Sequence, residues 1–228
     1  MSKAYTDLSM IPLRAAPSDR SEMVNQMLYG ESCEILSKEG AWAKIITDRD
    51  QYTAWVSRNQ LTYDKPLLAG ENMVHKPFQI FDFKLFPMGC KVSFETEKVV
   101  GDVSDLGKTF LDVPYLWGGR TFVGMDCSGF IQGIHAAFGV NLPRDAYQQA
   151  EVGETTHFHD YEALDLAYFK NEDGRITHVG LLLEGGEILH ASGQVRIDEF
   201  RRAGIFKNGT QTHDLAWIKR IRNRHPMY

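Results

Sequence analysis

The chain has 228 residues, of which 43% are hydrophobic and 11% aromatic, so it can form one or two domains with ordinary globular cores. A net charge of −5, without a long run of lysine or arginine, argues against a nucleic-acid partner. The first residues contain no apolar run that could serve as a signal peptide or membrane span. The sequence therefore predicts a cytoplasmic protein without a membrane partner, unless an export signal was removed.

Composition and pattern divide the chain into two parts. Residues 5–63 contain short β-rich segments broken by turns, with strands expected over 32–36, 41–46 and 52–56. Five or six short strands in about sixty residues predict a small barrel. The segment from Asp64 onward has scattered prolines and is interpreted as a linker, in which 78–81 and 92–95 could add strands. We place a first domain with its linker at 1–75 and a second domain at 76–228.

The second domain has an α+β pattern. Apolar spacing predicts helices over 99–110 and 127–138, and a shorter one over 144–150. Asp126 is a good N-cap for the middle helix, and Gly139 lies where a glycine would end it. Strands are expected over 163–169, 178–183, 187–190 and 216–221, in an antiparallel sheet. A helix that carries a nucleophile, packed on a sheet that carries bases, is a working architecture for a thiol hydrolase.

Cys127 is the candidate nucleophile. At the first turn of a helix it lies at the positive end of the helix dipole, which favours the thiolate. A cysteine before an apolar helix is equally often a small buried core residue. The glycines at 118, 119, 124 and 129 favour the catalytic interpretation, because they allow close approach to the thiol. The other two cysteines, Cys33 and Cys90, are interpreted as structural, and three widely spaced cysteines make a poor disulfide framework.

His178 and His190 flank an expected hairpin whose turn contains Gly185 and Gly186. A two-residue turn would put the two histidines on opposite faces of the sheet. A three-residue turn over 184–186 pairs residue 183 with 187 and puts both histidines on one face, within side-chain reach. Catalysis requires the second register. The remaining histidines carry weaker signals: the pair His157 and His159 fits a solvated loop better than a metal site, and His75, His135, His213 and His225 are isolated.

Several motifs occur in one order along residues 100–221. They are Tyr115-x-Trp-Gly-Gly, Asp126-Cys127-Ser128-Gly129, Leu142-Pro143-Arg144, Thr177-His178-Val179-Gly180 and Leu189-His190-Ala191-Ser192. Together they resemble the NlpC family of papain-like cell-wall peptidases, while residues 5–65 resemble a bacterial SH3-like domain. The resemblance implies that Cys127 is the nucleophile, His178 the base and His190 the residue that orients it. It also implies that Tyr115 helps an oxyanion hole together with the Cys127 backbone N–H.

The resemblance further implies a substrate. Family members hydrolyse the bond between γ-D-glutamyl and a diamino acid in peptidoglycan peptides, and forms with an SH3-like domain resemble murein-recycling enzymes that require a free N-terminal L-alanine. In this muropeptide-binding site, Asp126 is expected to hold the substrate amine and Ser128 to line the pocket. Tyr63 is expected to join them from the SH3-like domain, with Tyr52 and Trp55 as rivals. No metal or organic cofactor is implied.

Two departures from the family pattern are visible: Leu164 replaces the usual glycine before Asp165, and Ala146 stands where a hydroxyl is common. Two other functions remain open from the sequence. One is an exported endopeptidase that acts on intact peptidoglycan, and the other is a non-catalytic cell-wall-binding module.

Overall fold

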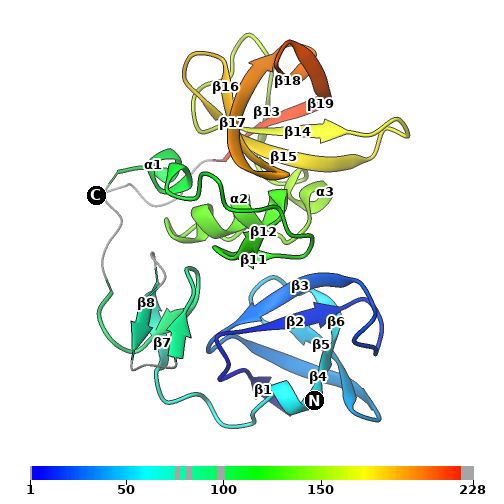
Figure 1. Cartoon of the computed structure of the whole chain (residues 1–228), viewed down its shortest axis with the longest axis vertical. Helices are drawn as coiled ribbons and strands as arrows, with labels where there is room; N and C mark the ends of the chain where they lie inside the picture. Colours follow the sequence, from blue (N-terminus) through cyan, green and yellow to red (C-terminus); the bar gives the residue numbers. More distant parts are fainter. Residues whose placement is uncertain (1, 75–77, 81–83, 97–100, 222–228) are drawn as a thin grey trace. The chain divides into compact units, whose positions relative to one another are not determined.

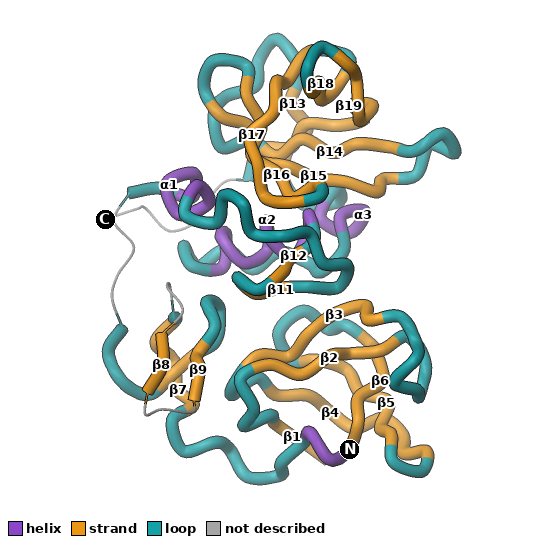
Figure 2. Tube along the Cα trace, in the orientation of Figure 1, coloured by secondary structure: helices purple, strands orange, loops and turns teal. Residues whose placement is uncertain are grey.

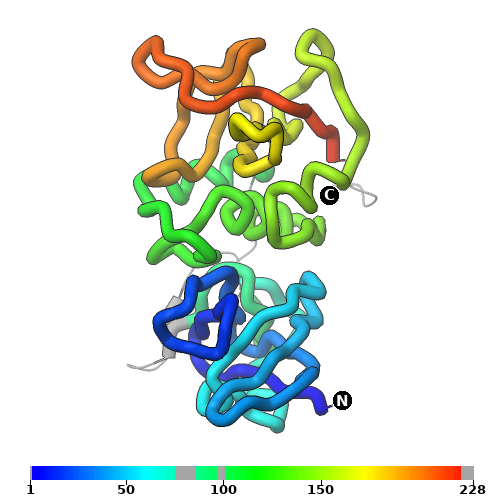
Figure 3. Tube along the Cα trace, turned by 90° about the vertical axis from the view of Figure 1, so that its right-hand side faces the viewer, coloured from blue at the N-terminus to red at the C-terminus, as the bar shows by residue number. Residues whose placement is uncertain are grey.

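The computed structural model describes residues 2–74, 78–80, 84–96 and 101–221, which form two compact units (Figures 1 and 3). The first unit comprises residues 1–99 together with 116–124, and the second comprises 100–115 and 125–228. Strands dominate both units, and the second adds short helices (Figure 2). No helix among the described residues is long and apolar enough to cross a membrane.

The first unit is built around a small antiparallel barrel, as the sequence predicts. Within the described residues its sheet has six strands in the order β1-β4-β5-β6-β2-β3. Their bounds are β1 Ser2–Tyr5, β2 Met10–Arg14, β3 Met23–Leu28, β4 Ser32–Glu39, β5 Trp42–Thr47 and β6 Thr53–Ser57, followed by a 3₁₀ helix at Arg58–Gln60. Alternate residues of these strands point inward, and Ile11, Leu13, Ile45 and Val56 are fully buried in the barrel core.

Part of the expected linker is folded into the first unit. β7 (Ala69–Met73) pairs with β10 (Lys91–Val92), and β8 (Phe78–Ile80) pairs with β9 (Lys84–Phe86). A second apolar cluster joins this segment to the barrel, because the ring of Tyr29 meets that of Phe86 edge-on at 4.9 Å beside buried Cys90. The compact unit therefore extends past residue 75, where the sequence places the domain boundary.

The segment Leu116–Gly124 belongs to the first unit because a buried arginine fixes it there. β11 (Arg120–Thr121) and β12 (Gly124–Met125) form a short hairpin. Both terminal nitrogens of the Arg120 guanidinium, Nη1 and Nη2, contact the Glu31 carboxylate, at 3.0 and 2.9 Å, and Nη1 also donates to the Gln26 carbonyl. Gly118 has φ +75°, and a Cβ there would lie 2.5 Å from the Met23 carbonyl oxygen, so only glycine fits.

The second unit packs helices on a curved antiparallel sheet, which confirms the α+β fold. Within the described residues the sheet order is β13-β19-β14-β15-β16-β17-β18, and β18 also pairs with β19, which closes β14–β19 into a barrel. The helices are α1 Val103–Lys108, α2 Cys127–Ala136 and α3 Ala146–Gln149. The strands are β13 Glu154–Thr156, β14 Leu166–Lys170, β15 Ile176–Leu183, β16 Glu187–Ser192, β17 Gln194–Arg201, β18 Gly204–Lys207 and β19 Thr210–Arg220. Helix α2 packs on β15 and β16.

Capping residues set the helix boundaries in this unit. The helix expected over 99–110 begins only at Val103, because the Asp102 side chain accepts hydrogen bonds from the backbone N–H groups of Ser104 and Asp105. Residues 99 and 100 of that prediction lie outside the described residues. Asp126 caps α2 as predicted, and Gly139 follows α2 with φ +78°.

Candidate active site

Helix α2 places the Cys127 thiol against strand β15. The N-terminus of α2 is fixed by the Asp126 carboxylate, which accepts a 2.7 Å hydrogen bond from the Gly129 N–H. Cys127 is the first residue of the helix and is 5% exposed. Its sulfur lies 4.0 Å from the Thr177 carbonyl oxygen and also interacts with the Val179 backbone. The thiol therefore meets β15 on both sides of His178.

The resting thiol is neutral. Burial and the nearby Asp126 carboxylate raise the pKa of Cys127 to about 12, although the Val179 backbone and the Arg144 charge oppose this shift. Burial also raises the pKa of Cys33 and of Cys90 to about 12. Burial thus opposes the effect expected from the helix N-terminus, which favours a thiolate. A neutral buried thiol requires a base to remove its proton.

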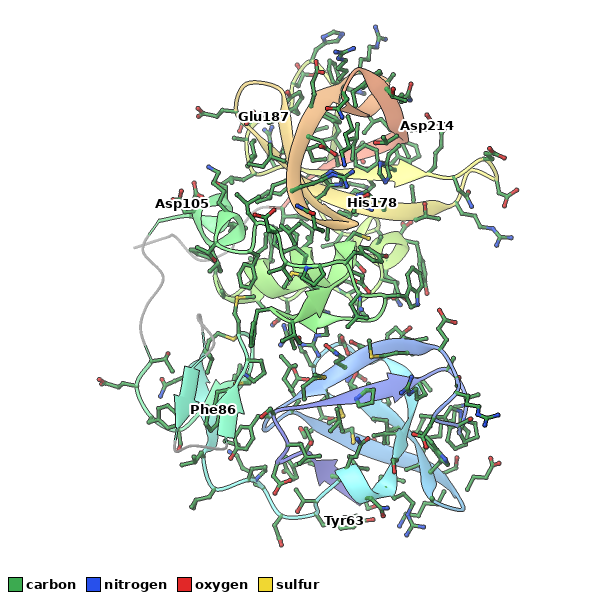
Figure 4. The ribbon with its side chains drawn as sticks, viewed as in Figure 1. Tyr63, Phe86, Asp105, His178, Glu187 and Asp214 are labelled. Atoms are coloured by element: carbon green, nitrogen blue, oxygen red, sulfur yellow. The ribbon has the colours of Figure 1, made fainter. Side chains whose placement is uncertain are left out.

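His178 and His190 form the predicted pair; the side chain of His178 is labelled in Figure 4. The hairpin turn leaves Leu183 opposite Glu187 and Leu181 opposite Leu189, which confirms the three-residue turn. The Nε2 atom of His178 lies 2.8 Å from Nδ1 of His190. The motif glycine Gly180 lies close to β16, since a Cβ there would lie 2.7 Å from Cδ1 of Ile188 and 3.0 Å from Cβ of His190.

Both imidazoles are buried, which favours their neutral forms. Burial lowers the pKa of His178 well below its ordinary value, and the neighbouring His190, His213 and Arg196 lower it further. Burial also lowers the pKa of His190, although the Asp198 carboxylate opposes that shift. At neutral pH the site therefore contains a neutral thiol beside a neutral imidazole, which is the starting state for general-base catalysis.

Two residues near the histidines were missed from the sequence. Asp198 of β17 accepts a hydrogen bond at 3.0 Å from Nε2 of His190. The ring of His213, on β19, stacks on that of His178 with centroids 4.2 Å apart and planes 27° apart. The interpretation of His213 as isolated is wrong. It was missed because His213 reaches His178 across 35 residues of chain, through β14, which pairs with both β19 and β15. The available signal for Asp198 was the alternation of polar and apolar residues from Gln194 to Asp198.

A buried ion pair lies behind the nucleophile. Arg144, 1% exposed, contacts both oxygens of Asp126 at 3.0 and 2.5 Å and donates to Ser128 Oγ at 3.0 Å. The arginine of the third motif thus pairs with the residue that precedes the nucleophile. The roles predicted for Asp126 and Ser128 in substrate binding stay predictions, and both side chains have structural partners as well.

The two tyrosines predicted for the site lie in different units. Burial raises the pKa of Tyr115, with further contributions from Cys127 and Asp126, so Tyr115 lies in the electrostatic surroundings of the thiol. Its backbone N–H donates to the Gly193 carbonyl at 2.9 Å. Tyr63 belongs to the first unit, where it is 55% exposed and Lys38 Nζ lies 5.7 Å from its ring centroid. Its predicted role in binding stays a prediction.

Comparisons with known proteins agree with this geometry. Residues 112–213 match the NlpC/P60 family, and residues 13–61 match a family described as the bacterial dipeptidyl-peptidase SH3 domain. A γ-D-glutamyl-L-lysine dipeptidyl-peptidase of Bacillus subtilis (strain 168) is 30% identical over 210 residues, which cover 73% of this chain and 71% of that protein. The chain belongs to the NlpC/P60 family.

Other NlpC/P60 proteins extend the similarity. A protein of the same name from Bacillus cereus is 24% identical over 76% of this chain and 68% of its own length. The crystal structure of an NlpC/P60 family protein from Bacillus cereus has the same fold, with a TM-score of 0.78 over 96% of this chain and 99% of that one, at 18% identity. Family membership and the paired histidines beside Cys127 identify a cysteine peptidase of a peptidoglycan-related family.

Proposed function

We propose that this cysteine peptidase hydrolyses the γ-D-glutamyl–diamino acid bond of peptidoglycan-derived peptides that have a free N-terminal L-alanine. One observation carries the proposal: a single chain joins the dipeptidyl-peptidase type of SH3 domain to a cysteine–histidine site, at 30% identity to a γ-D-glutamyl-L-lysine dipeptidyl-peptidase. A dipeptidyl-peptidase removes two residues from a free amino terminus, so such an enzyme must recognise that terminus.

In the proposed reaction, His178 and Cys127 carry out the first half together. His178 takes the proton of Cys127 as the sulfur attacks the γ-carbonyl carbon, so an S–H bond breaks while N–H and C–S bonds form. Negative charge then develops on the carbonyl oxygen. The Cys127 backbone N–H, at the start of α2, and the Tyr115 hydroxyl are the groups that stabilise it.

The second half regenerates the thiol. His178 returns its proton to the departing amino group of the diamino acid, which leaves the L-Ala-γ-D-Glu portion as a thioester on Cys127. Water, activated by the same imidazole, hydrolyses this thioester. His190 holds the His178 ring through the 2.8 Å hydrogen bond during both proton transfers.

Defined peptides test this proposal. The full chain is incubated with L-Ala-γ-D-Glu-L-lysine and with its meso-diaminopimelate counterpart, and products are identified by mass spectrometry. Release of L-Ala-D-Glu, with little cleavage of the N-acetylated peptides, is the expected result. Equal cleavage of acetylated and free peptides would contradict the requirement for a free amine.

We also propose that the enzyme acts in the cytoplasm on peptides released from the wall, as in murein recycling. Cell fractionation with an antibody to the chain tests the location. Incubation with purified intact peptidoglycan tests the substrate, because peptides attached to glycan lack the free amine. Efficient release of peptide from intact wall would instead support an exported endopeptidase.

A further inference from the structure

A buried carboxylate lies behind the second histidine. Strand β17 pairs with β16 so that Arg196 lies opposite His190 and Asp198 lies opposite Ile188. The Asp198 side chain is 8% exposed, and its Oδ2 atom lies 3.0 Å from Nε2 of His190. We propose that Asp198 is a positioning residue that fixes the tautomers of His190 and His178, so that His178 presents an unprotonated Nδ1 to the thiol.

The positions of the protons follow from the hydrogen bonds. Burial alone would raise the pKa of Asp198, but hydrogen bonds from His190 and Arg196 lower it to about 2, so the carboxylate only accepts. Nε2 of His190 must therefore carry its proton. A neutral imidazole has one donor and one acceptor nitrogen, so Nδ1 of His190 accepts from Nε2 of His178. His178 is then protonated on Nε2, and its Nδ1 keeps a free lone pair.

The free nitrogen is on the side of the ring nearest the nucleophile. Nδ1 is bonded to the ring carbon that joins the side chain, so it lies closer than Nε2 to the backbone of its own residue. The Cys127 sulfur interacts with the backbone of Thr177 and of Val179, the residues on either side of His178. The tautomer that Asp198 imposes is therefore the one in which the base can take the thiol proton.

Without the carboxylate, the same atoms would favour the opposite arrangement. Arg196 Nε donates to Oδ2 of Asp198 at 2.7 Å. If that acceptor is removed, the guanidinium can donate to Nε2 of His190, which moves the His190 proton to Nδ1. His178 must then accept at Nε2 and carry its own proton on Nδ1, facing the thiol, where it cannot act as a base.

Other charged and titratable groups surround the pair and favour neutral rings. His213 stacks on His178, and its pKa is lowered to about 4, chiefly by burial, so it is uncharged at neutral pH. Arg196 and, more weakly, Lys207 disfavour protonation of His190. Asp198 is the acceptor that selects between the two neutral arrangements.

The unmodified protein provides the first test, which needs no peptide substrate and so does not depend on the proposed function. Nitrogen-15 NMR of histidine-labelled full-length protein distinguishes the tautomers at about pH 8, where ordinary histidines are neutral. Replacement of each histidine in turn assigns the signals. The proposal predicts that both His178 and His190 are protonated on Nε2. A proton on Nδ1 of either ring would overturn it.

Variants provide the second test, with the rate of Cys127 alkylation by iodoacetamide as the readout. Asp198→Ala should lower this rate by roughly tenfold or more, because a hydrogen bond from the charged Arg196 now favours the inactive tautomer. It should also shift the His190 proton to Nδ1 in the NMR spectrum. Asp198→Asn keeps an oxygen that can accept both hydrogen bonds, so it should retain the tautomers and most of the rate.

A matched control is available on the same strand. Glu199 is exposed and pairs with Arg201, away from the histidines, so Glu199→Gln should change neither the rate nor the tautomers. If Asp198→Ala does not fold, the tautomers in the parent spectrum still decide the question. Unchanged tautomers and an unchanged rate in Asp198→Ala would show that the carboxylate has no positioning role.

Discussion

The ion pair between Arg144 and Asp126 supports the helix that carries the nucleophile, and its removal gives a quantitative prediction. The two side chains are 1% and 8% exposed, with Nη2 2.5 Å from Oδ2. Arg144→Met keeps the apolar stem but leaves the carboxylate buried without its counter-charge. Breaking a buried pair in this way costs about 3–5 kcal/mol. Asp126→Asn should cost a similar amount, although asparagine still caps the helix.

The double variant separates charge pairing from packing. Because Arg144→Met and Asp126→Asn together remove both charges, their combined cost should be smaller than the sum of the two single costs. The difference should be about 1–3 kcal/mol, as expected for residues in one buried network.

Hydrogen exchange of peptides from α2 measures the effect within the second unit. A loss of about 3–5 kcal/mol corresponds to opening that is about 10²- to 10⁴-fold more frequent. Arg201→Met, which removes an exposed pair with Glu199, should leave α2 exchange unchanged because solvent screens that pair. Additive single variants, or an Arg144→Met effect of less than about tenfold, would refute the reasoning.

Three further predictions address strain, acid stability and the order of the histidines. Leu164 has φ +75°, which costs a non-glycine residue about 1–2 kcal/mol. Leu164→Gly should therefore raise the free energy of unfolding, measured by urea titration, by up to about 1 kcal/mol. A clear loss of stability would contradict the presence of backbone strain at Leu164. Burial lowers the pKa of His135 and His213 to about 4, so the unfolded chain binds more protons between pH 6.5 and 4. The free energy of unfolding should therefore fall as pH drops through this window, by on the order of 3 kcal/mol from His135 alone, and a stability independent of pH there would count against the burial. His178→Ala should lower kcat more than His190→Ala, because water can partly replace an orienting group but not the base. A larger loss of kcat in His190→Ala would instead make His190 the base.

Local signals in the sequence were sufficient for the parts of the fold that local contacts determine. Asp126 and Gly139 mark the ends of the nucleophile helix, and two glycines with positive φ set the turn that brings the histidines together. Gly180, the glycine of the Thr-His-Val-Gly motif, lies where β16 approaches too closely for a larger side chain.

Features that depend on distant pairing were not predictable in the same way. Asp198 reaches His190 only because β17 pairs with β16. Arg144 meets Asp126 across 18 residues. The raised pKa of the Cys127 thiol depends chiefly on how deeply α2 is buried against β15, which is a property of the folded unit.

The rate of peptide hydrolysis by the Cys127→Ala variant tests most directly whether Cys127 is the nucleophile. The substitution removes the attacking sulfur and leaves the Asp126 cap and the two histidines in place. With L-Ala-γ-D-Glu-L-lysine as substrate, and α2 hydrogen exchange as the check on folding, kcat should fall by about 10⁴-fold or more. A folded Cys127→Ala protein that hydrolyses the peptide within tenfold of the parent rate would contradict the assignment of Cys127 as the nucleophile.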